Sequence, residues 1–504
     1  MTNERLIEDG HPREECGVVG VFAPGRKESE LSAKFDVAKA LPLLQHRGQE
    51  SAAVGGRTYG RMNVVGGLGL VKDAIGRGEV SGLDNTDFAM GHVRYATSLL
   101  IEAANPDEKK RINRLAMQPM SRFPRDGVSF MLGLNGNCVN TEELLEKLKQ
   151  EKPKLSESDF VTDTAILTSL IAQRVKGGAS ISEALTSVVR EVSGAYSMVV
   201  WGEEQGEEKM WALRDPNGFR PLVLGALPNN GWVVASEIGA LNILHAEFNR
   251  EIPAGQLIEI SRDGLVESPI FDETNPTYCI FETFYLARPD QIIYDKRVRT
   301  MRISAGEKLA MKYPVKADVV VGVPDSGDDA AEGYARWSNI PKEDAFVRNR
   351  YTPDRSFIEG TQESRQAAIA LKISSVIEEY VAGKSVVVVD DSLVRSNTLA
   401  NLVQQLKDAG AREIHVRIAS DEIKHPCYYG VDMPDQSQLI AAHKTVEEIA
   451  ATIKADSLGF LPIEELREAT GSVDRNNRPL GTQALRFCDA CMTGHYPTPV
   501  NGHR

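Results

Sequence analysis

A short apolar run and the helix that follows it form the clearest pattern along the chain. Residues 386–389 are four consecutive valines, which predict a buried parallel strand because both faces of such a strand lie in a core. Apolar residues at helical spacing come next, and they stop at Gly410, a common end of a helix. The pattern therefore predicts a strand, a short polar loop and a helix with one apolar face. That face consists of Leu399, Leu402, Val403 and Leu406.

Two carboxylates, Asp390 and Asp391, lie where this strand ends. In open α/β sheets ligands bind at the carboxyl ends of the strands, and a helix N-terminus attracts phosphate. Paired aspartates at such a place suit a sugar diol or a magnesium-bound diphosphate. The alternative is an ordinary turn between strand and helix, in which aspartate is common.

The loop that contains this pair, residues 390–398 with the sequence DDSLVRSNT, resembles the phosphoribosylpyrophosphate loop of type I phosphoribosyltransferases. It is most similar to the DDSIVRGTT motif of the amidophosphoribosyltransferase family. The resemblance implies that backbone N–H groups of the loop hold the 5′-phosphate of the substrate. Ser396 and Asn397 replace a glycine and a threonine of that motif, so their side chains could crowd the phosphate. The implied substrate-binding residues are Arg395, Ser396, Asn397 and Thr398.

A second apolar strand, Cys16 to Phe22, begins with a cysteine and follows a polar leader, residues 1–15. If the leader were removed, the free α-amino group of Cys16 could accept the thiol proton, as in N-terminal-nucleophile hydrolases. The alternative is a buried structural cysteine on a core strand.

Six motifs follow this strand in a fixed order, and as a set they resemble class II glutamine amidotransferases. The resemblance implies the N-terminal-nucleophile fold, an α+β domain with four αββα layers, and Cys16 as its nucleophile. It assigns Arg94 to the α-carboxylate of glutamine and Asp163 to its ammonium group. Asn135 and the Gly136 N–H would form the oxyanion hole. The motifs are LQHRGQES (44–51), GHVRYAT (91–97), NGN (135–137), DT (163–164), GAYS (194–197) and RDPNGFRPLVLG (214–225).

The chain departs from these motifs at three places. Leu134 stands before NGN where a histidine is usual, and Ala165 replaces the glutamate of a DTE motif. Residues 98–117 form a long charged segment where the family has a glycine-containing turn, and we interpret them as a solvated insertion near the glutamine pocket.

The second half of the chain resembles the transferase half of the same family. Its motifs are CIFETFYLARPDQ (279–291), ADVVVGVPDSGDDAAEGYA (317–335) and RNRYTPDRSFIEGTQESR (348–365). Ser326 matches the position that acts with the acidic pair in a Mg²⁺-diphosphate site, which uses hard oxygen ligands. The third motif resembles a flexible loop that closes over the substrate and excludes water. Further implied substrate-binding residues are Arg350, Tyr351 and Arg355 in that loop, and Lys372 beyond it.

Four of the six cysteines lie outside the glutaminase half, and a disulfide framework is not expected in a large chain without an export signal. Ligation by thiolates alone suits a zinc site or an iron–sulfur cluster. One branch of the amidophosphoribosyltransferase family combines a leader before the nucleophile with a [4Fe–4S] cluster at such positions. The resemblance therefore favours a structural [4Fe–4S] cluster over zinc. The four residues are Cys279, Cys427, Cys488 and Cys491.

Composition and charge restrict the class of partner. The chain has 504 residues, 42% hydrophobic and 26% charged, which is ordinary for two or more globular domains. A net charge of −13 argues against general binding to nucleic acid or to an anionic membrane. No apolar run approaches the roughly 18–20 residues that span a bilayer, and the leader lacks the apolar core of a secretory signal. The expected location is the cytoplasm.

Taken together, the sequence predicts a glutamine-dependent amidophosphoribosyltransferase that opens purine synthesis. The predicted divisions are a propeptide (1–15), a class II glutamine amidotransferase domain (16–260), a type I α/β phosphoribosyltransferase domain (275–470) and a C-terminal cluster-binding segment (471–504). The family resemblance also implies Mg²⁺, inhibition by purine nucleotides and a homotetramer. Two alternatives remain: a diverged paralogue that aminates another phosphorylated sugar, and a regulatory nucleotide-binding protein without transferase activity.

Overall fold

The computed structural model describes residues 16–25, 32–95, 106–151, 162–348, 373–433, 435–471 and 486–500. The described chain divides into two compact units. The N-terminal unit contains residues 16–279, 427–433 and 496–500, and the C-terminal unit contains the other described residues from 280 to 495. The predicted domain boundaries stay predictions.

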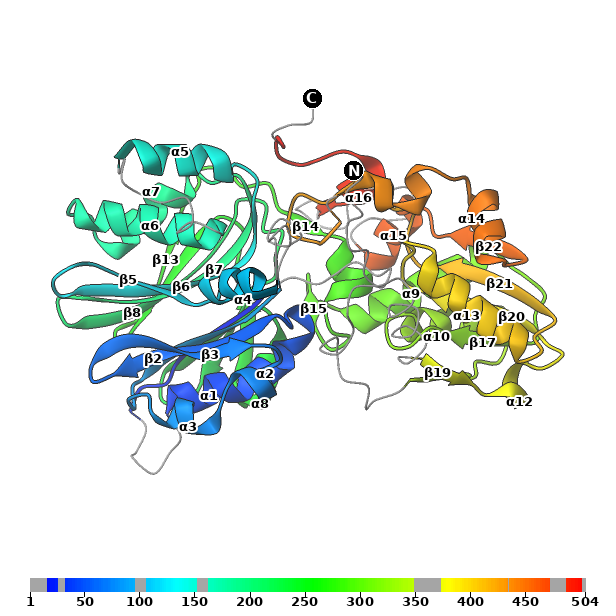
Figure 1. The fold of residues 1–504 in the computed structure, drawn as a ribbon, viewed down its shortest axis with the longest axis horizontal. Helices are drawn as coiled ribbons and strands as arrows, with labels where there is room; N and C mark the ends of the chain where they lie inside the picture. The colour runs from blue at the N-terminus through cyan, green and yellow to red at the C-terminus, as the bar shows by residue number, and fades with distance from the viewer. Residues whose placement is uncertain are drawn as a thin grey trace. The chain divides into compact units, whose positions relative to one another are not determined.

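Two antiparallel sheets form the centre of the N-terminal unit (Figure 1). Aromatic residues from both sheets stack in the core between them, with ring centroids 4.4 Å apart for Phe22 and Phe88 and 6.2 Å apart for Phe88 and Trp201. The first sheet has the order β11(Glu247–Glu251), β9(Val223–Leu227), β10(Gly231–Ala235), β1(Gly17–Phe22), β4(Phe88–Arg94), β2(Ser51–Thr58), β3(Arg61–Leu68). The second has the order β13(Gly264–Pro269), β12(Gln256–Ser261), β8(Glu207–Arg214), β7(Gly194–Glu204), β6(Val128–Cys138), β5(Met120–Arg125).

Helices cover the outer faces of these sheets, which gives the four αββα layers that the sequence predicts (Figure 1). On the first sheet lie α1(Ala33–Ala40), the 3₁₀ helix η1(Leu41–Arg47) and α8(Ile238–Ile243). On the second lie α5(Thr141–Glu151), α6(Asp163–Lys176) and α7(Ile181–Val189). The other elements of this unit are α2(Val71–Ala74), α3(Arg77–Ser81), α4(Pro106–Leu115) and β14(Thr277–Cys279).

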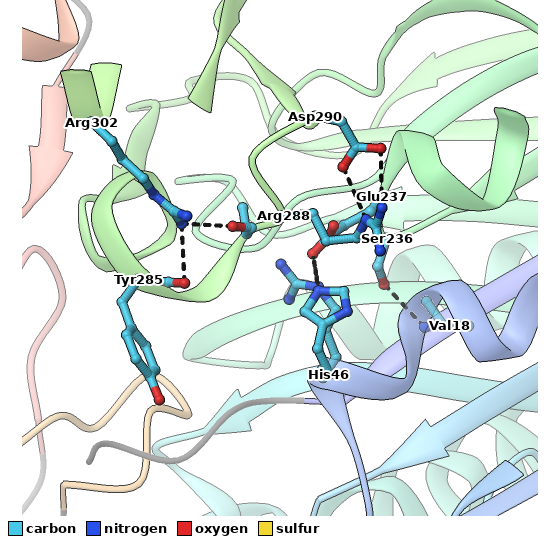
Figure 2. A network of polar contacts seen from close by, with 10 residues as sticks. Val18, His46, Ser236, Glu237, Tyr285, Arg288, Asp290 and Arg302 are labelled. Carbon is cyan, nitrogen blue, oxygen red and sulfur yellow. Dashed lines mark hydrogen bonds and ion pairs between the residues drawn. The ribbon is translucent and has the colours of Figure 1, made fainter. Parts of the chain in front are cut away.

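A buried ionic cluster ties the first sheet together close to the start of β1. Glu237 accepts hydrogen bonds from His46 Nε2 at 2.7 Å and from Arg47 Nε at 2.6 Å (Figure 2). The neighbouring Ser236 hydroxyl accepts one from the Val18 N–H at 3.0 Å. Although burial by itself raises the pKa of Glu237, the interactions with His46 and Arg47 lower it to about 2.

Replacing Glu237 by glutamine is expected to destabilise the N-terminal unit, because the buried Arg47 would lose its ion pair with Glu237. The folded-state pKa of about 2 lies below the ordinary value of 4.5, so this stabilisation is present above pH 4.5 and is lost as the pH falls through 2. The expected loss at neutral pH is roughly 3 kcal/mol. Urea unfolding followed by tryptophan fluorescence measures it. As a control, Glu208→Gln removes a partly exposed ion pair and should have a much smaller effect. A pH-independent difference between wild type and Glu237→Gln would contradict the assignment.

The C-terminal unit is built on a parallel sheet with the order β17(Val319–Gly322), β20(Ser385–Asp390), β21(Glu413–Ile418), β22(Ser457–Phe460). The predicted valine strand is confirmed as β20, and the predicted helix as α13(Asn397–Asp408), whose apolar stripe packs in the core of this unit. Gly410 follows that helix with a φ of +83°. The other helices include α9(Val298–Lys312), α10(Asp328–Ser338), α12(Glu378–Val381), α14(Val446–Ile453), α15(Ile463–Thr470) and α16(Ala490–Thr493). Shorter elements are β15(Ile292–Ile293), β16(Lys296–Arg297), β18(Phe346–Arg348), β19(Ile373–Val376), β23(Arg486–Cys488), η5(Gln436–Gln438) and η6(Ile440–Ala442).

A π-helical turn, η4(Glu282–Leu286), opens this unit and is held by one arginine. Arg302 of α9 donates from Nε to the Thr283 carbonyl at 3.1 Å and from Nη2 to the Ala287 and Tyr285 carbonyls at 2.7 and 3.1 Å (Figure 2). The guanidinium therefore satisfies carbonyl groups that a short helix leaves unpaired.

None of the helices in the described ranges has the length and apolarity needed to cross a membrane.

Candidate active sites

Cys16 lies directly before β1, beside the end of strand β4. Gly17 pairs with Val93, so the antiparallel register sets Cys16 opposite Arg94. The Cys16 thiol approaches the Tyr95 carbonyl oxygen, with Sγ at 3.9 Å. Burial raises the pKa of the thiol, and the charge of Arg94 opposes that shift only in part. The thiol is therefore protonated at neutral pH and needs a base to become a nucleophile.

Arg94 gives the site a buried positive charge, with its residue only 3% exposed. Burial lowers the pKa of the guanidinium, whereas Cys16, Glu50 and Asp163 raise it through their charges. The fork of N–H donors on arginine matches the two oxygens of a carboxylate. The position therefore suits the α-carboxylate of an amino acid.

Asp163 supplies the opposite charge at the first turn of α6. Its Oδ1 accepts from the Thr164 N–H at 2.7 Å, and its Oδ2 accepts from the Cys138 N–H at 3.3 Å. These bonds fix the carboxylate between α6 and the end of β6. Burial raises the pKa of Asp163, while the two N–H groups and Arg94 lower it. A buried carboxylate needs a counter-charge, so Asp163 suits the ammonium group of an amino acid.

Asn135 and Gly136 lie on β6, where they pair with Ser197 and Tyr196 of β7. The Asn135 side chain is fully buried, and within the described chain neither its Nδ2 nor its Oδ1 has a hydrogen-bond partner. An unpaired buried amide costs about 1–3 kcal/mol, which a substrate oxygen accepting from Nδ2 would offset. Gly136 has a φ of +141°, and a Cβ there would lie 2.0 Å from the Ala195 carbonyl oxygen, so only glycine fits. This pair has the character of an oxyanion hole.

The N-terminal unit holds all five of these predicted residues, but the sequence did not reveal some of their neighbours. Glu50 lies within the motif LQHRGQES, and its charge raises the pKa of Arg94. Nothing in the sequence of that motif indicates this interaction. Asn113 is buried and contacts Arg94, and nothing in its surrounding sequence marks it.

Residues 427–433 also belong to the N-terminal unit and reach the edge of this site. The Tyr428 carbonyl accepts from Asn137 Nδ2 at 3.0 Å, next to the oxyanion pair. The Asp432 carboxylate accepts from the Tyr95 hydroxyl at 3.2 Å.

The C-terminal unit places a second site at the carboxyl edge of its parallel sheet. Asp390 ends β20 and Asp391 follows it, and both are buried. Burial together with the adjacent Asp391 charge raises the pKa of Asp390 well above its ordinary value. The loop after β17 that carries Ser326 lies against the same edge, because a Cβ on Gly327 would come within 2.6 Å of the Val389 carbonyl oxygen. Two crowded carboxylates with a hydroxyl nearby form a hard oxygen donor set that fits Mg²⁺.

The phosphate loop leads from this pair into α13. Ser396 and Arg395 are half-buried, Asn397 is exposed and Thr398 is buried. Ser396 caps α13 without a side-chain hydrogen bond to it, so the first N–H groups of the helix point toward the loop. The predicted residues Arg350, Tyr351, Arg355 and Lys372 lie outside the described residues.

The four predicted cluster ligands are divided between the units, and none of them forms a disulfide. In the C-terminal unit, the Cys491 carbonyl accepts from the N–H groups of Lys424 and His425, both at 2.9 Å. In the N-terminal unit, the Cys427 thiol accepts from the Tyr429 N–H at 3.4 Å. Among the described residues no three histidine, cysteine, aspartate or glutamate side chains are gathered as metal ligands. A set of four thiols suits iron–sulfur or zinc in its chemistry, and the cluster stays a prediction.

Comparison with known proteins identifies both halves. Residues 111–243 match the family model of a glutamine amidotransferase domain, and residues 296–428 match that of a phosphoribosyl transferase domain. The amidophosphoribosyltransferase of Synechocystis sp. is 37% identical over 493 residues, covering 97% of this chain and 92% of that protein. The amidophosphoribosyltransferase of Mycobacterium bovis is 38% identical over 505 residues, covering 99% and 89%.

Solved structures agree. The glutamine phosphoribosylpyrophosphate amidotransferase from B. subtilis, complexed with ADP and GMP, matches with a TM-score of 0.82 and 33% identity over 97% of this chain and 98% of that one. The structure of the allosteric regulatory enzyme of purine biosynthesis matches with a TM-score of 0.84 and 34% identity over 97% of both chains. The chain therefore belongs to the amidophosphoribosyltransferase family of enzymes, which join a glutamine amidotransferase domain to a phosphoribosyl transferase domain.

Proposed function

We propose that the two sites act in sequence: the N-terminal unit releases ammonia from glutamine, and the C-terminal unit joins that ammonia to C1 of 5-phosphoribosyl 1-diphosphate. The products are glutamate, 5-phosphoribosylamine and diphosphate. The observation that carries the proposal is the buried, unpartnered amide of Asn135 beside Gly136, in the unit that also places Cys16, Arg94 and Asp163 within one electrostatic environment. That arrangement matches the charge distribution of a glutamine undergoing acyl transfer.

In the first half-reaction, Sγ of Cys16 attacks the side-chain carboxamide carbon of glutamine, and its proton passes to the α-amino group of Cys16. This step needs removal of residues 1–15, because an amide nitrogen is not a base. Asn135 Nδ2 and the Gly136 N–H donate to the oxyanion that forms. The amide nitrogen of the tetrahedral intermediate then takes up the proton held by the amine and departs as ammonia, and a thioester remains. Water hydrolyses the thioester to glutamate.

In the second half-reaction, the ammonia nitrogen attacks C1 of the ribose as the diphosphate leaves. Ser326, Asp390 and Asp391 would hold Mg²⁺, which when bound supplies positive charge that stabilises the diphosphate. The N–H groups at the start of α13 would hold the 5′-phosphate. The remaining contribution of the protein is to orient the reactants and exclude water.

An assay of the mature chain tests the proposal directly. With glutamine, 5-phosphoribosyl 1-diphosphate and Mg²⁺, glutamate and diphosphate should form in equal amounts, and added ammonia should replace glutamine. If no diphosphate forms with either glutamine or ammonia, the proposal is overturned. The side chains of Ser396 and Asn397 at the phosphate loop favour one second candidate, a transferase for another phosphorylated sugar. Faster amination of a different sugar phosphate would support that candidate.

Four finer properties extend the proposal. The cysteines would hold a structural [4Fe–4S] cluster, purine nucleotides would inhibit the enzyme, the assembly would be a homotetramer, and the reaction would open purine synthesis. The four-thiol donor set supports the cluster, and the ADP and GMP bound to the B. subtilis relative support inhibition by nucleotides. The similarity to an allosteric regulatory enzyme of purine biosynthesis supports the place in purine synthesis, and the homotetramer rests on the family resemblance alone.

An iron and sulfide analysis of protein purified without oxygen should give about four of each per chain. The Cys488→Ser variant should lose them and unfold more readily, because the cluster would hold the C-terminal segment in place. As a control, Ser129→Ala changes a residue that is not one of the four predicted ligands, and this variant should retain iron and sulfide. Zinc in place of iron would contradict the cluster.

A further inference from the structure

The helix within the predicted insertion brings a neutral amide to the buried arginine of the glutamine site. Asn113 lies in the last turn of α4 and is 6% exposed. Its Oδ1 accepts from Arg94 Nη1 at 3.4 Å. The distance is long for such a bond, so the guanidinium is oriented without being fully engaged, and its other N–H groups stay available.

The segment that carries Asn113 is anchored at its far end beside the oxyanion hole. Ala116 is fully buried, and Gln118 accepts through Oε1 from the Leu134 N–H at 2.7 Å. The Leu134 carbonyl in turn accepts from His92 Nε2 at 2.8 Å. Both polar groups of the residue before Asn135 are thus held by side chains. Asn113 within the insertion and Gln118 directly after it therefore both contact the site, although most of the described residues of α4 are exposed.

The chemical nature of Asn113 decides what it can do for Arg94. A carboxylate at this position would neutralise the guanidinium and compete with a substrate carboxylate. An apolar residue would leave the guanidinium without this acceptor, in a buried position where each lost bond is costly. An amide oxygen accepts one N–H and leaves the net positive charge unchanged.

We propose that Asn113 is a positioning residue that sets specificity for the α-carboxylate of glutamine by orienting Arg94. The inference rests on the proposed function, since it takes Arg94 as the group that binds this carboxylate. It gives the insertion a role in substrate selection within this enzyme.

The test compares glutamine with glutaminamide, in which a neutral amide replaces the α-carboxylate. In Asn113→Ala, kcat/KM for glutamine should fall about fivefold, mostly through KM, because a modest charged hydrogen bond is lost. The value for glutaminamide should stay nearly unchanged, so the preference for glutamine falls by the same factor. In the nearly isosteric Asn113→Asp, the loss for glutamine should be larger, because the new carboxylate competes with the substrate.

Two controls separate the possible failures. Arg111→Ala changes an exposed residue of the same helix and should leave the preference intact. Ammonia-dependent transfer should be equal in all variants, which shows that they are folded. Equal losses for both substrates, or no loss, would overturn the role of Asn113. A wild-type chain that does not hydrolyse glutamine would instead overturn the proposed function.

Discussion

Replacing Cys16 by alanine is expected to abolish glutamine hydrolysis and glutamine-dependent amination, with a loss of roughly 10⁴-fold or more. The proposed acyl intermediate forms on Sγ of Cys16, which alanine lacks. Ammonia-dependent transfer should persist, because the acidic pair of the C-terminal unit is untouched. Parallel assays of glutamate release and diphosphate release, each with glutamine or ammonium chloride, measure both halves.

Cys138 provides a matched control within the same unit. It is buried, and burial together with Asp163 raises the pKa of its thiol well above the ordinary value, so it stays protonated. Cys138→Ala should therefore retain glutaminase activity close to wild type. Full glutaminase activity in Cys16→Ala would show that Cys16 is not the nucleophile. Loss of glutaminase activity in Cys138→Ala alone would point to Cys138 instead.

The double replacement Asp390→Asn and Asp391→Asn should largely abolish transfer to the ribose and leave glutamine hydrolysis, the reverse of the result for Cys16→Ala. Removing both carboxylates takes away the anionic ligands for Mg²⁺, and transfer to the ribose should fall at least about a hundredfold with either nitrogen source. Glutamine hydrolysis should remain measurable. The fold should tolerate the change, because burial already favours a neutral Asp390.

Asp318→Asn is the control for this pair, since Asp318 lies at the opposite, amino edge of the same sheet, where it pairs with Arg412 at 3.1 Å. Its transfer activity should be unchanged. Diphosphate release with Mg²⁺ titrated from zero measures both variants. An unaltered Mg²⁺ dependence in the double variant would rule out the carboxylates as ligands.

The sequence predicted most of the fold because its signals were local and strong. Four valines predict a buried strand in almost any context, and the ordered motifs around Cys16 correspond to strands and turns of one layered domain. Within the glutamine site, the residues that carry charge or a special backbone shape, such as Arg94 and Gly136, lie in those motifs.

Residues that act through packing could not be predicted in the same way. Asn113 reaches Arg94 only because α4 is held by Ala116 and Gln118, and this placement depends on tertiary contacts with no sequence signature. The partners of Glu237 are about 190 residues away along the chain, a separation that no local pattern resolves. The charged insertion was interpreted as solvated because its helix is polar, and most described residues of that helix are exposed, but Asn113 is buried.

The path of the chain limits how its halves can be separated in the laboratory. Arg220, in the core of the N-terminal unit, donates to the Tyr429 carbonyl at 3.1 and 2.6 Å, and the Tyr429 hydroxyl is 2.9 Å from Thr498 Oγ1. A gene truncated after codon 279 would encode neither Tyr429 nor Thr498, so the fully buried Arg220 would lose the Tyr429 carbonyl as an acceptor. A free-standing glutaminase would therefore have to retain two distant peptides, supplied by a fusion or added in trans.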